Sequence, residues 1–211
     1  MVKRSIIVIS LMFVVLGIQA QEVSRRVTEY EEFKPAVIHL ATGKDISTPQ
    51  ANIFLKNSTL LYVSGAKTKE AFTESLKSVD FDDRTYYRVD TLLAYKVDSV
   101  GTNVLFCARL IDMHALSQMI SSRRQITNID VGDQITATSL RKVDGDEFDY
   151  PIVNQYYLLC GGKIVRAREH DVLRATPKAR RRAFWSTVRE AGFQWSSEES
   201  LMKLLKAISE S

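Results

Sequence analysis

The chain has 211 residues, of which 45% are hydrophobic and 26% charged, a composition typical of a globular protein that excludes a fibrous or mainly disordered one. Its formal net charge is +4, but two of the 29 basic side chains, Lys3 and Arg4, lie in a predicted leader. Without them 27 basic side chains stand against 25 acidic ones. A net charge of +2 favours no class of partner, so any electrostatic signal has to be local.

Residues 1–20 have the pattern of a secretory signal peptide. Two basic residues are followed by an apolar run, 6–16, that is too short to cross a bilayer comfortably, and Ala20 offers a small residue for cleavage. No cysteine stands directly after this run, at the cleavage position, which argues against a lipoprotein anchor. We therefore expect export to the periplasm or the cell surface, with Gln21 as the new N-terminus. An uncleaved membrane anchor is the alternative.

Residues 21–34 are charged and only weakly periodic, and we expect them to form a partly ordered N-terminal arm. Residues 35–111 alternate short β-branched and aromatic runs with turn signals such as Thr-Gly, Lys-Asn-Ser and Asp-Asp, which is the pattern of hairpins. The strands expected in this β module are Ala36–Leu40, Asn52–Leu55, Leu60–Val63, Val79–Phe81, Thr85–Val89, Leu92–Val97 and Val104–Ile111.

A flat, open sheet of such short strands would expose edges that pair with other chains. We therefore predict an antiparallel meander that closes into a small SH3-like or Sm-like barrel, with a sandwich as the alternative. The residues expected in its core are Ile53, Leu55, Leu60, Tyr62, Val79 and Phe81.

Residues 112–168 are predicted to be a mixed extension with further strands. Asp112 is placed to cap a short helix whose apolar face contains Leu116, Met119 and Ile120. Two strands are expected beyond it, Ile135–Leu140 and Ile152–Leu159, with an acidic loop at 144–149 between them. Gly161 and Gly162 then turn the chain into a final strand, Lys163–Arg166.

Residues 169–211 are predicted to be a C-terminal helical tail, which makes the fold α+β and mainly β. Thr176 stands at an N-cap position, Pro177 at the first helical position and Gly192 where the chain leaves the helix. Ser196 and Glu199 have the spacing of a capping box before the last helix. The apolar positions of that helix, spaced by three or four residues, form one stripe: Leu201, Leu204, Leu205 and Ile208.

Three stretches carry a resemblance. They are the Ala-Gln-Glu junction at 20–22, the β module at 36–97, and an ending at 161–208 with a Gly-Gly-Lys hairpin, a basic helix and the run Phe-Gln-Trp-Ser-Ser-Glu-Glu-Ser-Leu. The chain resembles uncharacterised exported proteins of the Bacteroidota with a β-rich N-terminal module and a helical tail. The resemblance implies export and architecture, and it supplies no activity or catalytic residues.

The two cysteines, Cys107 and Cys160, each lie in an apolar run. A disulfide between two strands is one interpretation, because an exported chain enters an oxidising compartment. Two buried free thiols are the other. A catalytic cysteine is disfavoured, because nothing in the sequence places His39, His114 or His170 beside a thiol.

Acidic residues cluster around Arg84 and are candidates for the paired carboxylates of glycoside hydrolysis: Asp80, Asp82, Asp83 and Asp90. Alternation along the strand gives the simpler explanation of a solvated face. The acidic loop does not match the spacing of a calcium loop, and the adjacent residues 169–171 are poorly arranged for chelation. We therefore expect no metal and no cofactor.

One local charge excess stands out: Lys178, Arg180, Arg181 and Arg182, with Arg189 beyond it. It is a candidate contact for anionic lipid, lipopolysaccharide or a protein, whereas export disfavours nucleic acid. A solvated helix face is the simpler explanation. The same helix should dock through Phe184, Trp185 and Val188, which share its apolar side.

The sequence favours an exported, non-catalytic binding or structural module of the cell envelope, whose partner is a protein or another envelope component. One alternative is a hydrolase that acts on envelope or dietary glycans through the carboxylates near Arg84. Another is a membrane-surface module that uses the basic helix for peripheral contact. The sequence gives no positive support for an enzyme, because it contains no phosphate-cradling glycine loop and no nucleophile elbow.

Overall fold

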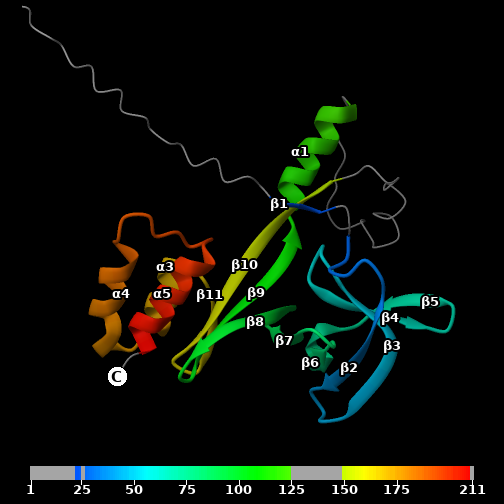
Figure 1. Ribbon diagram of the computed structural model, residues 1–211, viewed down its shortest axis with the longest axis horizontal. Coiled ribbons are helices and arrows are strands. Elements are labelled where there is room, and N and C mark those ends of the chain that lie inside the picture. Colours follow the sequence, from blue (N-terminus) through cyan, green and yellow to red (C-terminus); the bar gives the residue numbers. More distant parts are fainter. Residues whose placement is uncertain (1–21, 25–26, 125–148, 210–211) are drawn as a thin grey trace, which may run out of the picture.

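The computed structural model describes residues 22–24, 27–124 and 149–209 (Figure 1). The expected signal peptide, the strand expected at 135–140 and nearly all of the acidic loop lie outside these residues. The strands are β1 (Glu22–Ser24), β2 (Lys34–Leu40), β3 (Asp45–Phe54), β4 (Thr59–Ser64), β5 (Lys67–Glu70), β6 (Leu76–Asp80), β7 (Thr85–Val89), β8 (Leu92–Val100), β9 (Asn103–Ile111), β10 (Tyr150–Cys160) and β11 (Lys163–Arg166). The helices are α1 (Met113–Arg124), α3 (Glu169–Ala175), α4 (Arg181–Val188) and α5 (Glu198–Ser209), with 3-10 turns η1 (Thr73–Ser75) and η2 (Lys178–Arg180).

All strands belong to one antiparallel sheet with the order β1-β10-β9-β8-β7-β6-β2-β3-β4-β5, and β11 also pairs with β10. The fold is mainly β with a helical C-terminus, as expected. Closure into a small barrel is not confirmed, because the sheet stays open and β5 lies at its edge. The tip of the β3–β4 hairpin instead touches β8, where the Ser58 hydroxyl donates to the Leu93 carbonyl over 2.6 Å. The Leu93 amide donates back to the Ser58 carbonyl over 2.8 Å.

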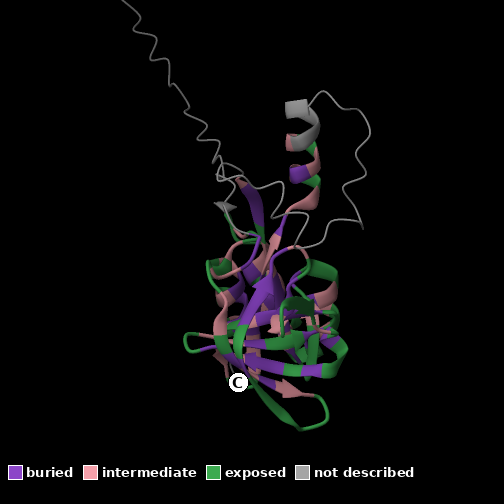
Figure 2. Cartoon of the chain, turned by 90° about the vertical axis from the view of Figure 1, so that its right-hand side faces the viewer, coloured by how far each residue is buried: buried purple, intermediate pink, exposed green. Residues whose placement is uncertain are grey.

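The curled sheet buries two main cores. In the β module, five of the six expected core residues are buried, while Tyr62 is only partly covered. Figure 2, which views this module end-on, shows buried residues along the middle of the strands and exposed ones on the hairpins. A second core lies between β8, β9 and β10 and the helical lobe, which we define as residues 161–209. In Figure 1 this lobe and the β2–β5 strands occupy opposite ends of the molecule.

The residues before β2 run along the end of β3 as an ordered segment. The amide of Glu29 donates to the Ile53 carbonyl over 2.9 Å, and residues 30–33 form a short loop between this contact and the regular β2–β3 pairing that begins at Lys34. The fully buried Asn52 side chain is bonded to this loop: it accepts from the Tyr30 amide and donates to the Tyr30 and Glu32 carbonyls. A buried backbone group without such a partner would be costly, so this side chain holds the segment in place.

The cap expected for the first helix after the β module is confirmed. The Asp112 carboxylate accepts from the amides of His114 and Ala115, each over 3.0 Å, at the start of α1. Leu116 on its apolar face is fully buried. Within the described ranges, no helix combines the length and the apolar character needed to span a membrane.

The expected stripe of α5 is confirmed, since Leu201, Leu204, Leu205 and Ile208 are all buried. Its cap lies one residue later than predicted. The Ser200 amide donates to the hydroxyl of Ser197 over 3.3 Å, and the Leu201 amide to the Ser197 carbonyl, so Ser197 and not Ser196 begins the helix.

The basic helix is shorter than predicted. The Thr176 hydroxyl donates to the Val172 carbonyl over 2.7 Å, so this residue ends α3 instead of capping the next helix. Pro177 is extended, with ψ of 145°, and the chain then forms η2 before α4. Docking of α4 agrees with the prediction, because Phe184 is fully buried and Trp185 packs partly covered against the same core.

Candidate functional site

A groove of about 760 Å³ opens at the end of the β module, between the β2–β3 hairpin, the β4–β5 hairpin and η1. Side chains alternate between the two faces of a strand, so Ile38 and Leu40 lie on the same face of β2, and Leu60 and Tyr62 lie on the same face of β4. Both pairs line the groove together with residues of β3, β5 and η1. The lining is completed by Ile46, Ser47, Thr48, Pro49, Val63, Ser64, Lys69, Glu70, Ala71, Phe72, Ser75 and Leu76.

The rim of this groove presents large apolar side chains to solvent. Phe72 is 83% exposed and Ile46 is 40% exposed, and among the described residues only Tyr87, Val153 and Ile164 are comparable exposed large hydrophobics. Exposed apolar surface that gathers around a concavity marks an interaction site more often than scattered apolar residues do. The exposure of Phe72 thus points to the same place as the hollow.

Two ionisable side chains lie at the groove, and their surroundings differ. The Glu70 carboxylate accepts from the Asn57 amide group over 2.7 Å and from the Thr59 hydroxyl over 2.6 Å. The Lys69 ammonium donates to the Ser64 hydroxyl over 3.2 Å and forms no ion pair within the described residues. The groove therefore combines an apolar lining with a positive charge at its rim.

The carboxylates predicted as a hydrolytic group are divided among different partners. His39 lies between one of them, Asp80, and Asp45, which was not predicted: its Nδ1 is 2.7 Å from the Asp45 carboxylate and its Nε2 is 2.9 Å from that of Asp80. Asp45 is directly across from His39 in the β2–β3 register, and Asp80 is on the neighbouring β6. The hydrogen bonds from Asp80 and Asp45 raise the pKa of His39.

Asp82 and Asp83 form a separate group in the β6–β7 turn. Each has a carboxylate oxygen 3.5 Å from the Lys34 ammonium, and the Tyr30 hydroxyl donates to Asp83 over 2.9 Å. Partial burial acts to raise the pKa of Asp83, but this hydrogen bond and the charge of Lys34 outweigh it, and the pKa is lowered. A general acid needs a raised pKa, so Asp83 is not suited to that role.

The fourth predicted carboxylate, Asp90, lies at the β7–β8 turn with a φ of 57°.

The disulfide considered between Cys107 and Cys160 is not formed, and both thiols are free and buried. In the β9–β10 register Cys107 is across from Tyr156, four residues before Cys160. At about 3.3 Å per residue the two Cα atoms are roughly 13 Å apart, whereas a disulfide needs less than about 7 Å. Burial raises the pKa of Cys107 to about 11, and it raises that of Cys160 as well, so both are protonated thiols.

A row of aromatic hydroxyls crosses the sheet where the two cores meet, and sequence reasoning did not find it. Successive pairings place Tyr86 of β7 beside Tyr95 of β8, Tyr95 beside Cys107 of β9, and Cys107 beside Tyr156 of β10. Burial raises the pKa of Tyr156 to about 12 and raises those of Tyr86 and Tyr95 further, so all three stay protonated phenols. Among the described residues the buried Tyr86 hydroxyl has no partner in hydrogen-bonding geometry, although the nearby Arg84 guanidinium acts to lower its pKa.

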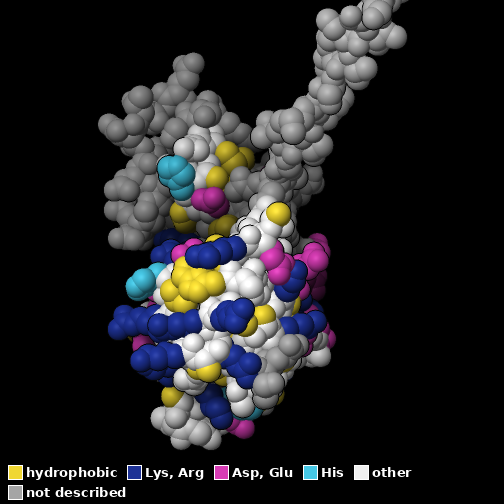
Figure 3. All heavy atoms as spheres, turned by 90° about the vertical axis from the view of Figure 1, so that its left-hand side faces the viewer, with side chains coloured by type: hydrophobic (Ala, Val, Ile, Leu, Met, Phe, Trp, Pro, Cys, Tyr) yellow, Lys and Arg dark blue, Asp and Glu magenta, His cyan; other side chains and the backbone are white. Residues whose placement is uncertain are grey.

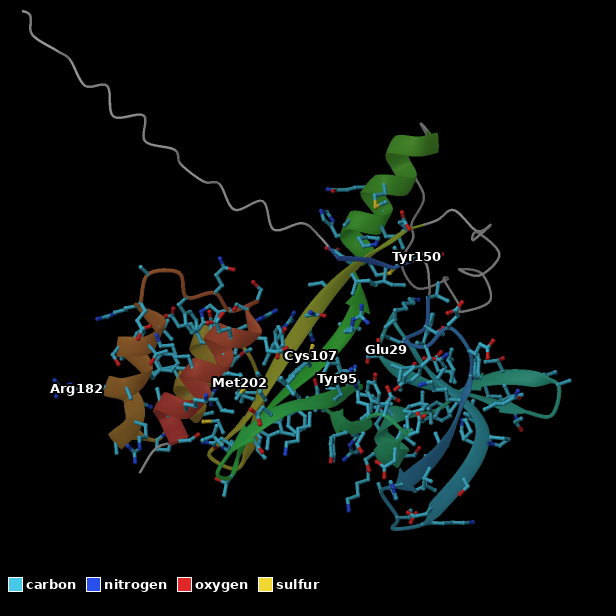
Figure 4. All side chains as sticks on the ribbon, viewed as in Figure 1. Glu29, Tyr95, Cys107, Tyr150, Arg182 and Met202 are labelled. Carbon is cyan, nitrogen blue, oxygen red and sulfur yellow. The ribbon has the colours of Figure 1, made fainter. Side chains whose placement is uncertain are left out.

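Charged side chains cover this row from the N-terminal side. The Glu29 side chain is only 8% exposed, and its carboxylate lies 3.4 Å from Arg84 and 3.2 Å from Arg109. The Arg84 guanidinium also stacks on Tyr95, 4.1 Å from the ring centroid. Figure 4 shows Glu29, Tyr95 and Cys107 between the helical lobe and the β2–β5 strands. The contacts tie the N-terminal segment to β9, and we assign them a structural role.

The basic run lies on the outer side of the helical lobe. Lys178, Arg181 and Arg182 are exposed on η2 and α4, whereas Arg180 is half-buried. Arg182 points away from the rest of the molecule (Figure 4). The sequence-predicted site residues therefore occupy separate places, with the cysteines in the core and the basic residues on the surface.

The groove was not predicted from the sequence, and its residues were assigned to strands and core. The available signal was the isolated Phe72 in a polar stretch, 67–75, where no apolar periodicity requires it. Comparison of the chain with family models, with curated proteins and with solved structures found no match.

Proposed function

We propose that this chain is an exported, non-catalytic binding module that holds an amphipathic small molecule with a negatively charged end. The observation that carries the proposal is the groove, whose volume of about 760 Å³ lies within the range of roughly 300–1,000 Å³ common for small-molecule sites. Export is proposed from the pattern of residues 1–20.

The chemistry of the groove selects the class of ligand. Its floor is formed by aliphatic side chains such as Leu40, Leu60 and Leu76, which favour an unbranched apolar body. Lys69 at the rim has no carboxylate partner in the described part of the chain, and it suits a carboxylate or similar anion at the ligand's end. An alkyl carboxylate combines both features.

The distribution of carboxylates supports binding over glycan hydrolysis. Glycosidases generally use two carboxyl groups that flank one bond. Among the described residues that line the groove, Glu70 is the one carboxylate, and its oxygen is engaged by Asn57 and Thr59. Of the acidic residues near Arg84, Asp80 is paired with His39, and Asp82 and Asp83 are paired with Lys34, all outside the groove.

Calorimetric titration with octanoate, decanoate and dodecanoate tests the proposal. Each additional buried methylene contributes about 0.8 kcal/mol, so affinity should rise about fourfold per methylene. The matching uncharged alcohols should bind more weakly, because they lose the attraction to Lys69.

A matched pair of variants locates the site. Ile46 is 40% exposed, pairs with Ile38 on the face that lines the groove, and lines the groove itself, so Ile46→Trp should fill the space and abolish binding. Lys96→Trp places the same side chain at an exposed position of β8 and should bind as the unchanged protein does. Equal binding by both variants, or an affinity that does not vary with chain length, would rule the groove out as the site.

A further inference from the structure

Charge is unevenly distributed along the sequence. Residues 161–211 contain 11 Lys and Arg against 6 Asp and Glu, whereas residues 21–160 contain 16 against 19. The C-terminal part therefore carries a net charge of +5 and the remainder one of −3, although the sum is close to neutral. A molecule with this separation orients itself in an electric field near a charged surface.

The positive charge is concentrated on one side of η2 and α4. Positions 178, 182 and 189 follow each other at roughly helical spacing and Arg181 lies beside them, so we define Lys178, Arg181, Arg182 and Arg189 as the basic face. All four are exposed, while the opposite side of α4 buries Phe184 and Thr187. Figure 3 views this end of the molecule and shows Lys and Arg side chains gathered over it.

The basic face lacks internal compensation. Among the described residues none of its four cations forms an ion pair, and Arg189 instead stacks on Trp185, 5.0 Å from the ring centroid. Nearby acids have other partners: Glu190 pairs with Lys203, and Asp171 with His170. Like charges one helical turn apart destabilise a helix, so the arrangement is unfavourable for folding alone.

We propose that the basic face docks the protein on an anionic membrane surface by binding lipid phosphate groups. Arginine matches phosphate oxygens with two parallel hydrogen bonds, and three of the four cations are arginines. Export, expected from the leader, brings the chain to membranes rather than to nucleic acid. In Figure 1 α4 forms one extremity, with the β2–β5 strands that carry the groove at the other, so a docked molecule keeps the groove open to solvent.

Vesicle sedimentation of the exported chain tests this inference. The protein should bind phosphatidylcholine vesicles that contain phosphatidylglycerol, should ignore pure phosphatidylcholine vesicles, and should be released by added salt. The variant Lys178→Ser/Arg181→Ser/Arg182→Ser should lose about a hundredfold in partition, equivalent to roughly 1 kcal/mol per cation at 1.4 kcal/mol per factor of ten.

Two controls separate the basic face from net charge and from the groove. Lys44→Ser/Lys67→Ser/Lys77→Ser removes the same charge from exposed positions of the β module and should leave partition nearly unchanged. The groove-filling variant Ile46→Trp should also bind vesicles normally. Equal losses in both triple variants, or no binding to anionic vesicles, would overturn the proposal. Equally tight binding of double-stranded DNA or of an acidic protein at the same salt would also overturn it, by replacing the lipid surface with a general polyanion.

Discussion

The two ends of this molecule use one sheet in opposite ways. In the helical lobe, helices cover the sheet and bury a continuous apolar stripe, while charged residues such as Arg182 lie on the outside. At the far end of the β module none of the described helices covers the strands, and apolar side chains such as Phe72 stay exposed around a groove. What covers a sheet face therefore decides whether the resulting surface is convex and charged or concave and apolar.

The two ends also differ in the contacts that stabilise them. The helical lobe depends on packing among fully buried aliphatic and aromatic side chains. The β module has its own apolar core, but polar contacts of Asn52 fix its N-terminal segment, and those of His39 join β2 to β3 and β6.

Phe184→Ala should have the largest effect, a loss of about 3–5 kcal/mol in the free energy of unfolding, because it leaves a cavity in the core of the helical lobe. Urea denaturation followed by tryptophan fluorescence measures it, since Trp185 and Trp195 both lie in this lobe. Circular dichroism in the same experiment reports on the whole sheet. A loss below about 1 kcal/mol, the scale of a surface substitution, would show that the lobe does not depend on this packing.

Asn52→Ala should cost about 1–3 kcal/mol, because the Tyr30 amide and the Glu32 carbonyl would each lose a part-buried hydrogen bond. Hydrogen exchange should then show lower protection for the segment 27–33 while the helical lobe keeps its protection. Asn57→Ala is the control, since its side chain is exposed at a turn. If both variants were equally stable, the hydrogen bonds of Asn52 would be unimportant for stability.

His39→Gln should change stability by no more than about 1 kcal/mol, because solvent screens this partly exposed cluster. The folded-state pKa of His39 is raised, so its contribution is fully present below the unfolded value of about 6.5 and is lost as the pH rises through the raised pKa. Thermal unfolding should show a larger stability difference between the unchanged protein and the variant near pH 5.5 than near pH 9. Both pH values lie above the ordinary carboxylate pKa of about 4, so carboxylates do not titrate between them. A difference that grows with pH would contradict this sign.

Replacing Arg180, Arg181 and Arg182 by Ser should barely alter the melting temperature, within about 0.5 kcal/mol, because side chains of this kind on a surface contribute little to folding. Trp185→Ala, on the same helix, should lower it clearly. Differential scanning calorimetry compares the two. Unfolding of the arginine variant with a silent tryptophan variant would show that α4 does not dock through its apolar side.

Local patterns predicted the parts of the fold that depend on neighbours in sequence. The hairpins at Asn57 and at Gly161, the cap at Asp112 and the stripe from Leu201 to Ile208 are each specified within a dozen residues. The cap of α5 was wrong by one position because Ser196 and Ser197 are both good caps, and only the geometry of the turn selects between them.

The groove and the open sheet depend instead on contacts between distant segments. β2 pairs with β6 as well as with β3, which leaves the ends of β2 and β4 facing a common space. Periodicity shows that Tyr62 faces inward, but it does not show that nothing covers it. The row through Tyr86, Tyr95 and Tyr156 likewise exists only once three strand registers are known.

The short strand β1 has a kinetic consequence. Glu22 pairs with Ile152, so β1 cannot form until a strand 130 positions later in the sequence is in place. Closing so long a loop is entropically costly and slow compared with hairpin formation, and we expect pulse-labelled hydrogen exchange to show β1 protected after β3 and β4. During synthesis β10 emerges long after β1. β1 is therefore synthesised early but is among the last strands to pair.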